Sequence, residues 1–340
     1  LHAFIHVAAA RARAAARAAE AEIAKGRYRG PLHGIPIGLK DIYDTKDIPT
    51  TAHSRQLQDR IPEADAVTTR RLAEAGTVLL GKLATHEFAF GGPSFDLPWP
   101  PARNPWNPAH FTGGSSSGTG AAVAAGLVLG GLGSDTGGSI RLPAALCGLA
   151  GLKPTYGRVP RTGIFPLAWS LDHAGPMAWT VEDCALLLQA IAGHDPSDPA
   201  SADRPVPDYT ARLNEGVRGL RIGVVRHFHE RDNPVNDATR QGIEDAIAFF
   251  RREGAVISEV VLPPLLDWRA AALVILLAEG YAVHEEWMRT RFDQYGELLR
   301  DRLVLGVLLS GADYIQAQRR RRRLTAEMAS VLAERDLLLT

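Results

Sequence analysis

The chain has 340 residues, of which 46% are hydrophobic and 22% are charged, a balance typical of globular proteins. Thirty-eight basic residues offset 38 acidic ones, so no excess charge favours nucleic acid or an anionic membrane surface. Two cysteines are too few for a disulfide framework, and no apolar run is long enough to span a bilayer. These totals predict a cytoplasmic protein in a reducing compartment.

The first part of the chain alternates helix and strand patterns around glycine-rich segments. In chain order we expect a helix at 3–25, a buried strand at 34–43, a helix at 65–76, a short strand at 77–81, a Gly-, Pro- and Ser-rich loop at 91–120, a short helix at 121–126 and a strand at 127–132. A loop as long as the one predicted here is usually functional or disordered in a compact domain.

The alternation continues in the second part of the chain. We expect a helix at 181–193, a polar connection at 195–218, a strand at 220–225, a helix at 237–253, a strand at 256–261 and mainly helix at 266–335. Repeated strand–helix units predict an α/β fold with a mixed, largely parallel central sheet covered by helices on both faces. The start at Leu1 and the end directly after an apolar run indicate a fragment cut at both ends.

A glycine-rich turn, Ser134–Ser139, contains a candidate nucleophile. Ser139 follows Gly137 and Gly138, and successive backbone N–H groups on such a turn can hold an anion. A serine at its end could attack a carbonyl while these groups stabilise the oxyanion. A tight turn with an incidental serine is the alternative interpretation.

Lys40 is a candidate base because it interrupts an apolar stretch. Burial favours the neutral form of lysine, and shifts of several pKa units are documented for buried lysines. The alternative is a lysine at a strand end, paired with Asp41 or Asp44.

The loop Gly113–Gly118 places three serines among glycines. A hydroxyl both accepts and donates a proton, so one of these serines could connect Ser139 with Lys40.

Together these segments resemble the amidase signature family. The residues that carry the resemblance are Gly34–Asp41, Gly113–Gly118, Gly133–Pro143, Cys147–Arg158 and Ser170–Pro176. The resemblance extends over about 25–225 and weakly to the end of the chain. The order and spacing of the lysine and the two serines make it a specific signal.

The resemblance implies a Ser–cisSer–Lys triad. Carried over by position, Ser139 is the nucleophile, Ser115 is the relay and Lys40 is the base. A cis peptide would join Gly114 to Ser115. The resemblance also implies an oxyanion hole from the N–H groups of Thr136, Gly137, Gly138 and Ser139, a place beside the substrate for Ala89, and structural support from Asp135 and Arg141.

By resemblance, residues 1–340 form a single amidase-signature domain, with a catalytic core at about 25–225 and a helical and α/β remainder at 226–340. We expect the C-terminal part of the family's fold to be missing. The implied activity is hydrolysis of the C–N bond of a small or medium carboxamide through a seryl acyl-enzyme, with no metal and no organic cofactor. The expected partner is the small-molecule amide. We expect no direct binding of nucleic acid and no association with a membrane, and the sequence leaves open whether the protein forms a homodimer.

A second activity stays open, that of the A subunit of the glutamyl-tRNA(Gln) amidotransferase, which releases ammonia from glutamine for a partner protein. That subunit usually has Gln after the arginine of the nucleophile loop, whereas Leu142 follows Arg141 here. Ser117 and Thr112 also depart from the common pattern, and we expect neither to abolish activity. A non-catalytic binding protein on the same scaffold is a third alternative.

Four other motifs receive simpler interpretations. Ser116 fits a G-x-S-x-G nucleophile elbow, but no strand pattern precedes it. The Asp-Thr-Gly triplet at Asp135 lacks the second triplet that an aspartic protease needs. We interpret His227 and His229 as a surface pair at a strand end rather than metal ligands. We expect the arginines at 319–323 to be solvated and ion-paired.

Overall fold

The computed structural model describes residues 1–340, which form two compact units. Unit 1 comprises Leu1–Ala211 and Glu279–Gly306, and unit 2 comprises Arg212–Ala278 and Val307–Thr340. All residues of the predicted catalytic site belong to unit 1. The single domain inferred from the family resemblance stays a prediction.

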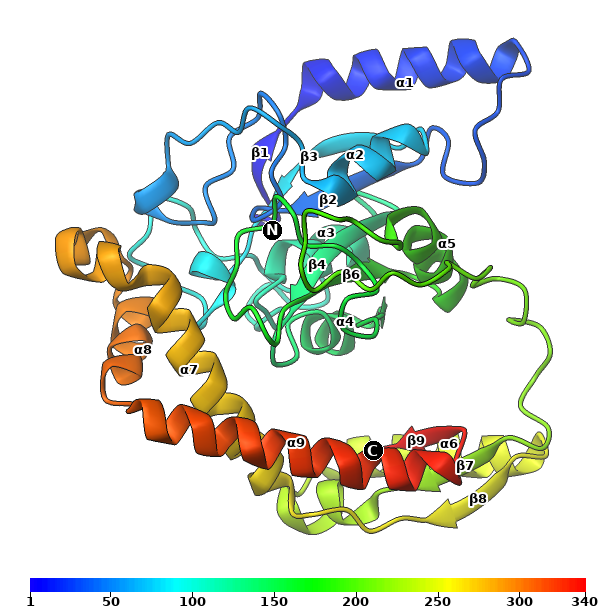
Figure 1. Cartoon of the computed structure of the whole chain (residues 1–340). Helices are drawn as coiled ribbons and strands as arrows, with labels where there is room; N and C mark the ends of the chain where they lie inside the picture. Colours follow the sequence, from blue (N-terminus) through cyan, green and yellow to red (C-terminus); the bar gives the residue numbers. More distant parts are fainter. The chain divides into compact units, whose positions relative to one another are not determined.

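Unit 1 is built on a six-stranded sheet with the strand order β1-β3-β2-β4-β6-β5 (Figure 1). Its strands are β1 (Phe4–Val7), β2 (Pro36–Lys40), β3 (Val78–Leu83), β4 (Gly130–Asp135), β5 (Ala150–Gly151) and β6 (His173–Ala178). The central strand β2 runs parallel to β3 and β4, whereas the other three pairs are antiparallel. The site described below lies at the carboxyl end of β2 and β4.

Nine α-helices and four short helical turns accompany the strands of the two units. The α-helices are α1 (Ala9–Ala24), α2 (Val67–Glu74), α3 (Ser117–Ala124), α4 (Arg141–Cys147), α5 (Val181–Ile191), α6 (Asp237–Arg252), α7 (Leu265–Thr290), α8 (Glu297–Val307) and α9 (Gly311–Ala333). The 3-10 turns are Arg55–Leu57, Glu87–Ala89 and Phe292–Gln294, and Phe228–Asp232 is a π-helical turn. Helix α7 begins in unit 2 and ends in unit 1.

Strand β4 is rich in glycine because helices approach it closely from both faces. A Cβ atom on Gly130 would lie 2.7 Å from Cδ1 of Leu187, on α5. Side chains alternate along a strand, and the next residue, Gly131, faces Thr119 of α3, whose Cγ2 would be 2.8 Å from an added Cβ. The sheet is therefore covered by helices on both faces, and the predicted α/β class is confirmed.

Several boundaries differ from the sequence predictions. The first residues of the helix predicted at 3–25 form a strand instead, because Phe4–Val7 pairs with β3, and the helix begins at Ala9. Helix α3 begins at Ser117 rather than at 121. The predicted strand at 127–132 lies three residues later, at Gly130–Asp135. In both segments small residues carry little apolar periodicity, so tertiary packing decides where the element begins.

Unit 2 contains a three-stranded parallel sheet. Its strands are β7 (Arg221–Val224), β8 (Val256–Glu259) and β9 (Leu337–Leu339), in the order β8-β7-β9. Strands β7 and β8 and the intervening helix α6 confirm the elements predicted there. Parallel pairs thus outnumber antiparallel pairs in the chain as a whole.

The structure corrects one interpretation in unit 2 and confirms another. His227 and His229 are not a surface pair, because both are buried. His229 lies in the π-helical turn that follows β7, and His227 directly precedes that turn. Nδ1 of His227 lies 3.0 Å from a carboxylate oxygen of Asp232, and Nε2 accepts from the Leu262 N–H. The arginine run on α9 is mostly exposed, and Arg320 pairs with Asp267 as expected for an ion-paired surface.

The close packing of β4 makes a stability prediction. Gly131→Ala should lower the free energy of unfolding by about 1–3 kcal/mol, because the new Cβ meets both Thr119 and the carbonyl oxygen of Gly38. Gly280→Ala is the matched control in unit 1. It lies on α7 and its Cβ would meet only ordinary contacts, the nearest at 3.5 Å. Chemical denaturation followed by circular dichroism measures both. Equal stability of the two variants would contradict the packing described here.

Candidate active site

Lys40 is the last residue of β2, and its side chain is fully buried. Its Nζ lies 2.6 Å from Oγ of Ser115 and 2.8 Å from Oγ of Ser134. Ser134 belongs to the adjacent strand β4. No carboxylate pairs with Lys40, so the alternative of a lysine paired with Asp41 or Asp44 is wrong. Asp41 instead lies 3.1 Å from Nζ of Lys82, the other buried lysine.

The electrostatic surroundings of Lys40 favour its neutral form. Burial lowers the pKa of Lys40 to about 7, although the negative charges of Asp135 and Asp172 act in the opposite direction. About half of the amines are therefore neutral near pH 7. A neutral amine has one lone pair and two N–H groups, so it can accept a proton from one serine while donating to the other.

Ser115 is almost fully buried, and a cis peptide bond joins it to Gly114, as the family resemblance implied. Its carbonyl oxygen accepts a hydrogen bond from the backbone N–H of His86 at 3.0 Å. The next residue, Ser116, lies at the start of α3. Its hydroxyl bonds only to the backbone of Ser134, at 3.2 and 3.3 Å. The Ser116 hydroxyl therefore connects two backbone segments, and Ser115 is the serine of this loop whose hydroxyl contacts Lys40.

Ser139 lies on the turn that follows β4 and is only partly buried. Its carbonyl oxygen accepts a hydrogen bond from the Ser116 N–H at 3.3 Å, which ties the two glycine-rich loops together. Its side chain has no hydrogen bond to Ser115 in this structure. Lys40 and Ser115 are therefore joined by a direct side-chain hydrogen bond. Ser139 is held next to Ser115 by the backbone hydrogen bond between Ser139 and Ser116.

Asp135 fixes the shape of the turn before Ser139. Its carboxylate accepts from the Gly138 N–H at 2.7 Å and the Ile140 N–H at 3.2 Å. Arg141 donates to both of its oxygens, at 2.8 and 2.9 Å. Burial alone would raise the pKa of Asp135, but the hydrogen bonds and charge of Arg141 and the backbone donors lower it to about 2. The carboxylate thus stays ionised at neutral pH.

The N–H groups of the turn differ in availability. Gly138 already donates to Asp135, so its role as an oxyanion donor stays a prediction. The structure gives no hydrogen-bond partner to the N–H groups of Thr136, Gly137 and Ser139. Such unpaired backbone donors on a glycine turn are what an oxyanion hole requires.

Two side chains that support this site were not singled out from the sequence. Ser134 contacts Lys40, as described above. Asp172 is partly buried, accepts from the Thr136 hydroxyl at 2.6 Å, and also accepts from the N–H groups of Leu167 and Ala168 at 2.8 to 3.1 Å. Asp172 belongs to Ser170–Pro176, one of the segments that carry the family resemblance, so the sequence could have indicated it as a residue near the site.

Ala89 is buried in the 3-10 turn Glu87–Ala89, and its φ of 61° is left-handed, as is the φ of 46° at Phe88. Its N–H donates to the carbonyl oxygen of His86 at 2.9 Å, and His86 in turn bonds to Ser115. Left-handed non-glycine residues are costly and often occur at functional sites. The place of Ala89 beside the substrate stays a prediction.

Comparison with known proteins decides the family. The family profile described as Amidase matches residues 1–340. The chain belongs to the amidase family. It is 45% identical to the A subunit of the glutamyl-tRNA(Gln) amidotransferase of Chloroflexus aggregans, over 99% of this chain and 71% of that protein. It is 43% identical to a protein named amidase from Pseudomonas putida, over 100% of this chain and 71% of that protein.

A solved structure similar to this amidase supports the same conclusion for the fold. A chain from a vestigial protein complex, described as revealing the evolutionary origins of an s-triazine catabolic enzyme, superimposes with a TM-score of 0.94 and 40% identity. The match covers 99% of this chain and 72% of that one. The family match makes the chain a hydrolase of amide bonds, and the superposition shows the α/β fold of that family.

Two kinds of feature are not found in the amidase. None of its helices combines the length and apolar character needed to cross a membrane. No group of three or more His, Cys, Asp or Glu side chains is placed to hold a metal ion.

The contact between Ser134 and Lys40 makes a kinetic prediction. Ser134→Ala should lower kcat/KM by about three- to tenfold, the value of one neutral hydrogen bond that holds the amine. Ser201→Ala is the matched control, because Ser201 is also a buried serine of unit 1 but its hydroxyl accepts from the Asp195 N–H. Hydrolysis of a simple amide by both variants checks the prediction. Equal rates in the two variants would remove Ser134 from the site.

Proposed function

We propose that this amidase cleaves a small or medium carboxamide to a carboxylate and ammonia or an amine, through an acyl-enzyme on Ser139. The observation that supports the proposal best is the fully buried Lys40 amine, held between two serine hydroxyls at 2.6 and 2.8 Å. A buried amine whose pKa is lowered to about 7 by its surroundings can act as a base near neutral pH.

In the proposed first step, the oxygen of Ser139 forms a bond to the amide carbon. The Ser139 proton moves to Ser115, and the Ser115 proton moves to the neutral amine of Lys40. The Lys40 N–H that faces Ser134 keeps the lone pair of the amine directed at Ser115. The N–H groups of Thr136, Gly137 and Ser139 stabilise the oxyanion that forms on the substrate.

In the second step, the C–N bond breaks and the leaving nitrogen takes a proton from Lys40 through Ser115. The products of this half-reaction are an ester on Ser139 and free ammonia or amine. Water then attacks the ester, its proton follows the same route to Lys40, and the carboxylic acid leaves. Lys40 returns this proton through Ser115 to the oxygen of Ser139, and the acid product releases its remaining proton to solvent to become the carboxylate, so the enzyme returns to its starting state.

The nucleophile is tested by a pair of serine variants. Ser139→Ala should lower kcat/KM for a simple amide by at least about a thousandfold. Ser116→Ala should retain much more activity, because the Ser116 hydroxyl bonds only to the backbone of Ser134. Intact-protein mass spectrometry after treatment with a fluorophosphonate should show one adduct in the wild type and none in Ser139→Ala. An adduct that persists in Ser139→Ala would assign the nucleophile elsewhere.

A second candidate function is glutamine hydrolysis within a tRNA-dependent amidotransferase. It is favoured by the 45% identity to the amidotransferase protein of Chloroflexus aggregans. The residue after Arg141 argues against this function, because it is Leu142 here and usually Gln in the amidotransferase. Rates with glutamine and with a panel of simple and aryl amides separate the two. We expect the purified chain to hydrolyse amides better than glutamine. Glutaminase activity that requires tRNA and a partner protein would favour the second candidate.

A further inference from the structure

His86 lies directly behind the peptide bond that precedes Ser115. The backbone N–H of His86 donates to the Ser115 carbonyl oxygen at 3.0 Å. A Cβ atom on Gly114 would be only 2.0 Å from Cε1 of the His86 ring, so this ring packs flat against a residue that must be glycine. On its other side, the ring stacks on Phe111, with 5.8 Å between ring centroids and 20° between ring planes. The imidazole therefore supports the backbone of the relay serine.

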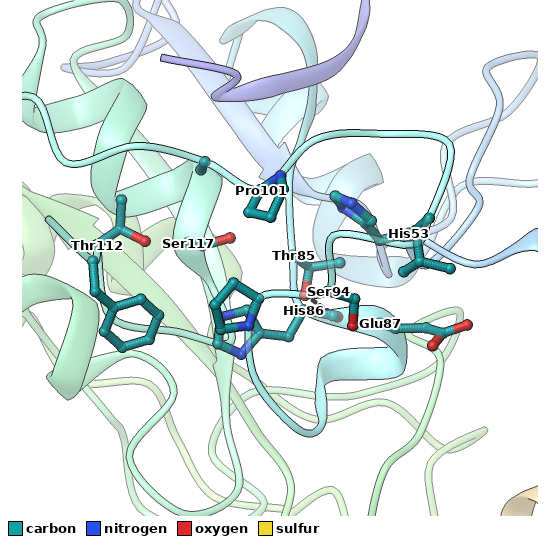
Figure 2. Close-up of a pocket in the computed structure, with 12 residues that line it drawn as sticks. His53, Thr85, His86, Glu87, Ser94, Pro101, Thr112 and Ser117 are labelled. Carbon is teal, nitrogen blue, oxygen red and sulfur yellow. Dashed lines mark hydrogen bonds between the residues drawn. The ribbon is translucent and has the colours of Figure 1, made fainter. Parts of the chain in front are cut away.

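The polar edge of the His86 ring faces a small pocket (Figure 2). Nε2 of His86 is buried and has no hydrogen-bond partner in the protein, and the same is true of Nδ1 of His53. Both side chains line this pocket together with the hydroxyl-bearing residues Ser94, Thr112 and Ser117. Two buried, unpaired imidazole nitrogens at one pocket are unusual, since buried polar atoms are normally hydrogen-bonded.

The protonation state of His53 follows from its other nitrogen. Nε2 of His53 lies 2.9 Å from the carbonyl oxygen of Trp99. A carbonyl oxygen only accepts, so Nε2 carries the proton and Nδ1 is an acceptor. Burial lowers the pKa of His53, and burial first and then the charge of Lys40 lower the pKa of His86 to about 3. Both rings are therefore neutral, and the pocket suits a neutral ligand that donates hydrogen bonds.

The size of the pocket limits the ligand to one small molecule. The space open to the centre of a water-sized sphere is about 10 Å³, which is close to the least that a single water molecule requires. Glu87 also lines the pocket, but its two carboxylate oxygens are taken by the Ser54 hydroxyl at 2.5 Å and the Gly296 N–H at 2.9 Å. Among the polar atoms of the pocket, the two histidine nitrogens are therefore the buried ones without a partner in the protein.

We propose that His53 and His86 form an internal binding site for one water molecule, and that this water fixes the His86 ring behind the Gly114–Ser115 peptide. His86 is then a positioning residue for the reaction, acting through Ser115 without touching the substrate. This role rests on the proposed function of Ser115 as proton relay. The water site itself does not depend on that function.

A high-resolution crystal structure of the whole chain tests the binding site. We expect one ordered water within about 2.7–3.2 Å of both Nδ1 of His53 and Nε2 of His86. A dry pocket, or a water bound to only one of the two nitrogens, would overturn the proposal. This result requires no activity, so it stands even if Ser139→Ala keeps full activity and the proposed function fails.

Kinetics test the positioning role. His86→Phe keeps a flat ring for stacking but removes the nitrogens, and should lower kcat about tenfold with KM changed less than about twofold. His86→Gln keeps hydrogen-bonding groups and should recover part of the loss. His229→Phe is the matched control, because His229 is a buried histidine of unit 2 whose nitrogens also lack partners. Equal losses in His86→Phe and His86→Gln, or no loss in His86→Phe, would overturn the role of the water.

Discussion

The site depends on the burial of a single amine. Lys40 has no carboxylate partner and is enclosed at the end of a central strand. Burial of a lysine disfavours its charge, and only hydrogen-bonding neighbours can offset the loss of water. The hydroxyls of Ser115 and Ser134 supply these contacts. The rest of unit 1 maintains this arrangement, because β4 carries Ser134 and the loop before α3 carries Ser115.

A second constraint fixes the turn that carries Ser139. The ionised Asp135 holds the backbone from Gly138 to Arg141, and Asp172 holds the Thr136 side chain. These carboxylates leave three N–H groups of the turn without a protein acceptor. A rigid turn with free donors stabilises a developing negative charge without having to reorganise during the reaction. In the proposed mechanism the two carboxylates therefore support the reaction without exchanging protons.

Sequence reasoning found the α/β class and the segments of the site because their signals are local. Lys40 interrupts an apolar strand, and Ser115 and Ser139 lie on glycine-rich loops. Their proximity required the family resemblance, since residues 40 and 115 meet only through the order of strands in the sheet. The support by Ser134, Asp172 and His86 was not predicted, because it comes from neighbouring strands and loops. The burial of His227 and His229 was misjudged for the same reason, because it depends on the π-helical turn Phe228–Asp232, which contains His229 and directly follows His227.

The protonation of Lys40 is the most direct test of its role as the base. NMR titration of the chain labelled with ¹³C at the lysine ε-carbons, with the Lys40 signal assigned by its loss in Lys40→Met, measures the pKa of this one amine. We predict a pKa of about 7 for Lys40, with the neutral form dominant above that pH. A Lys40 pKa near that of an ordinary lysine, about 10.4, would leave the amine charged at neutral pH and contradict its role as a base.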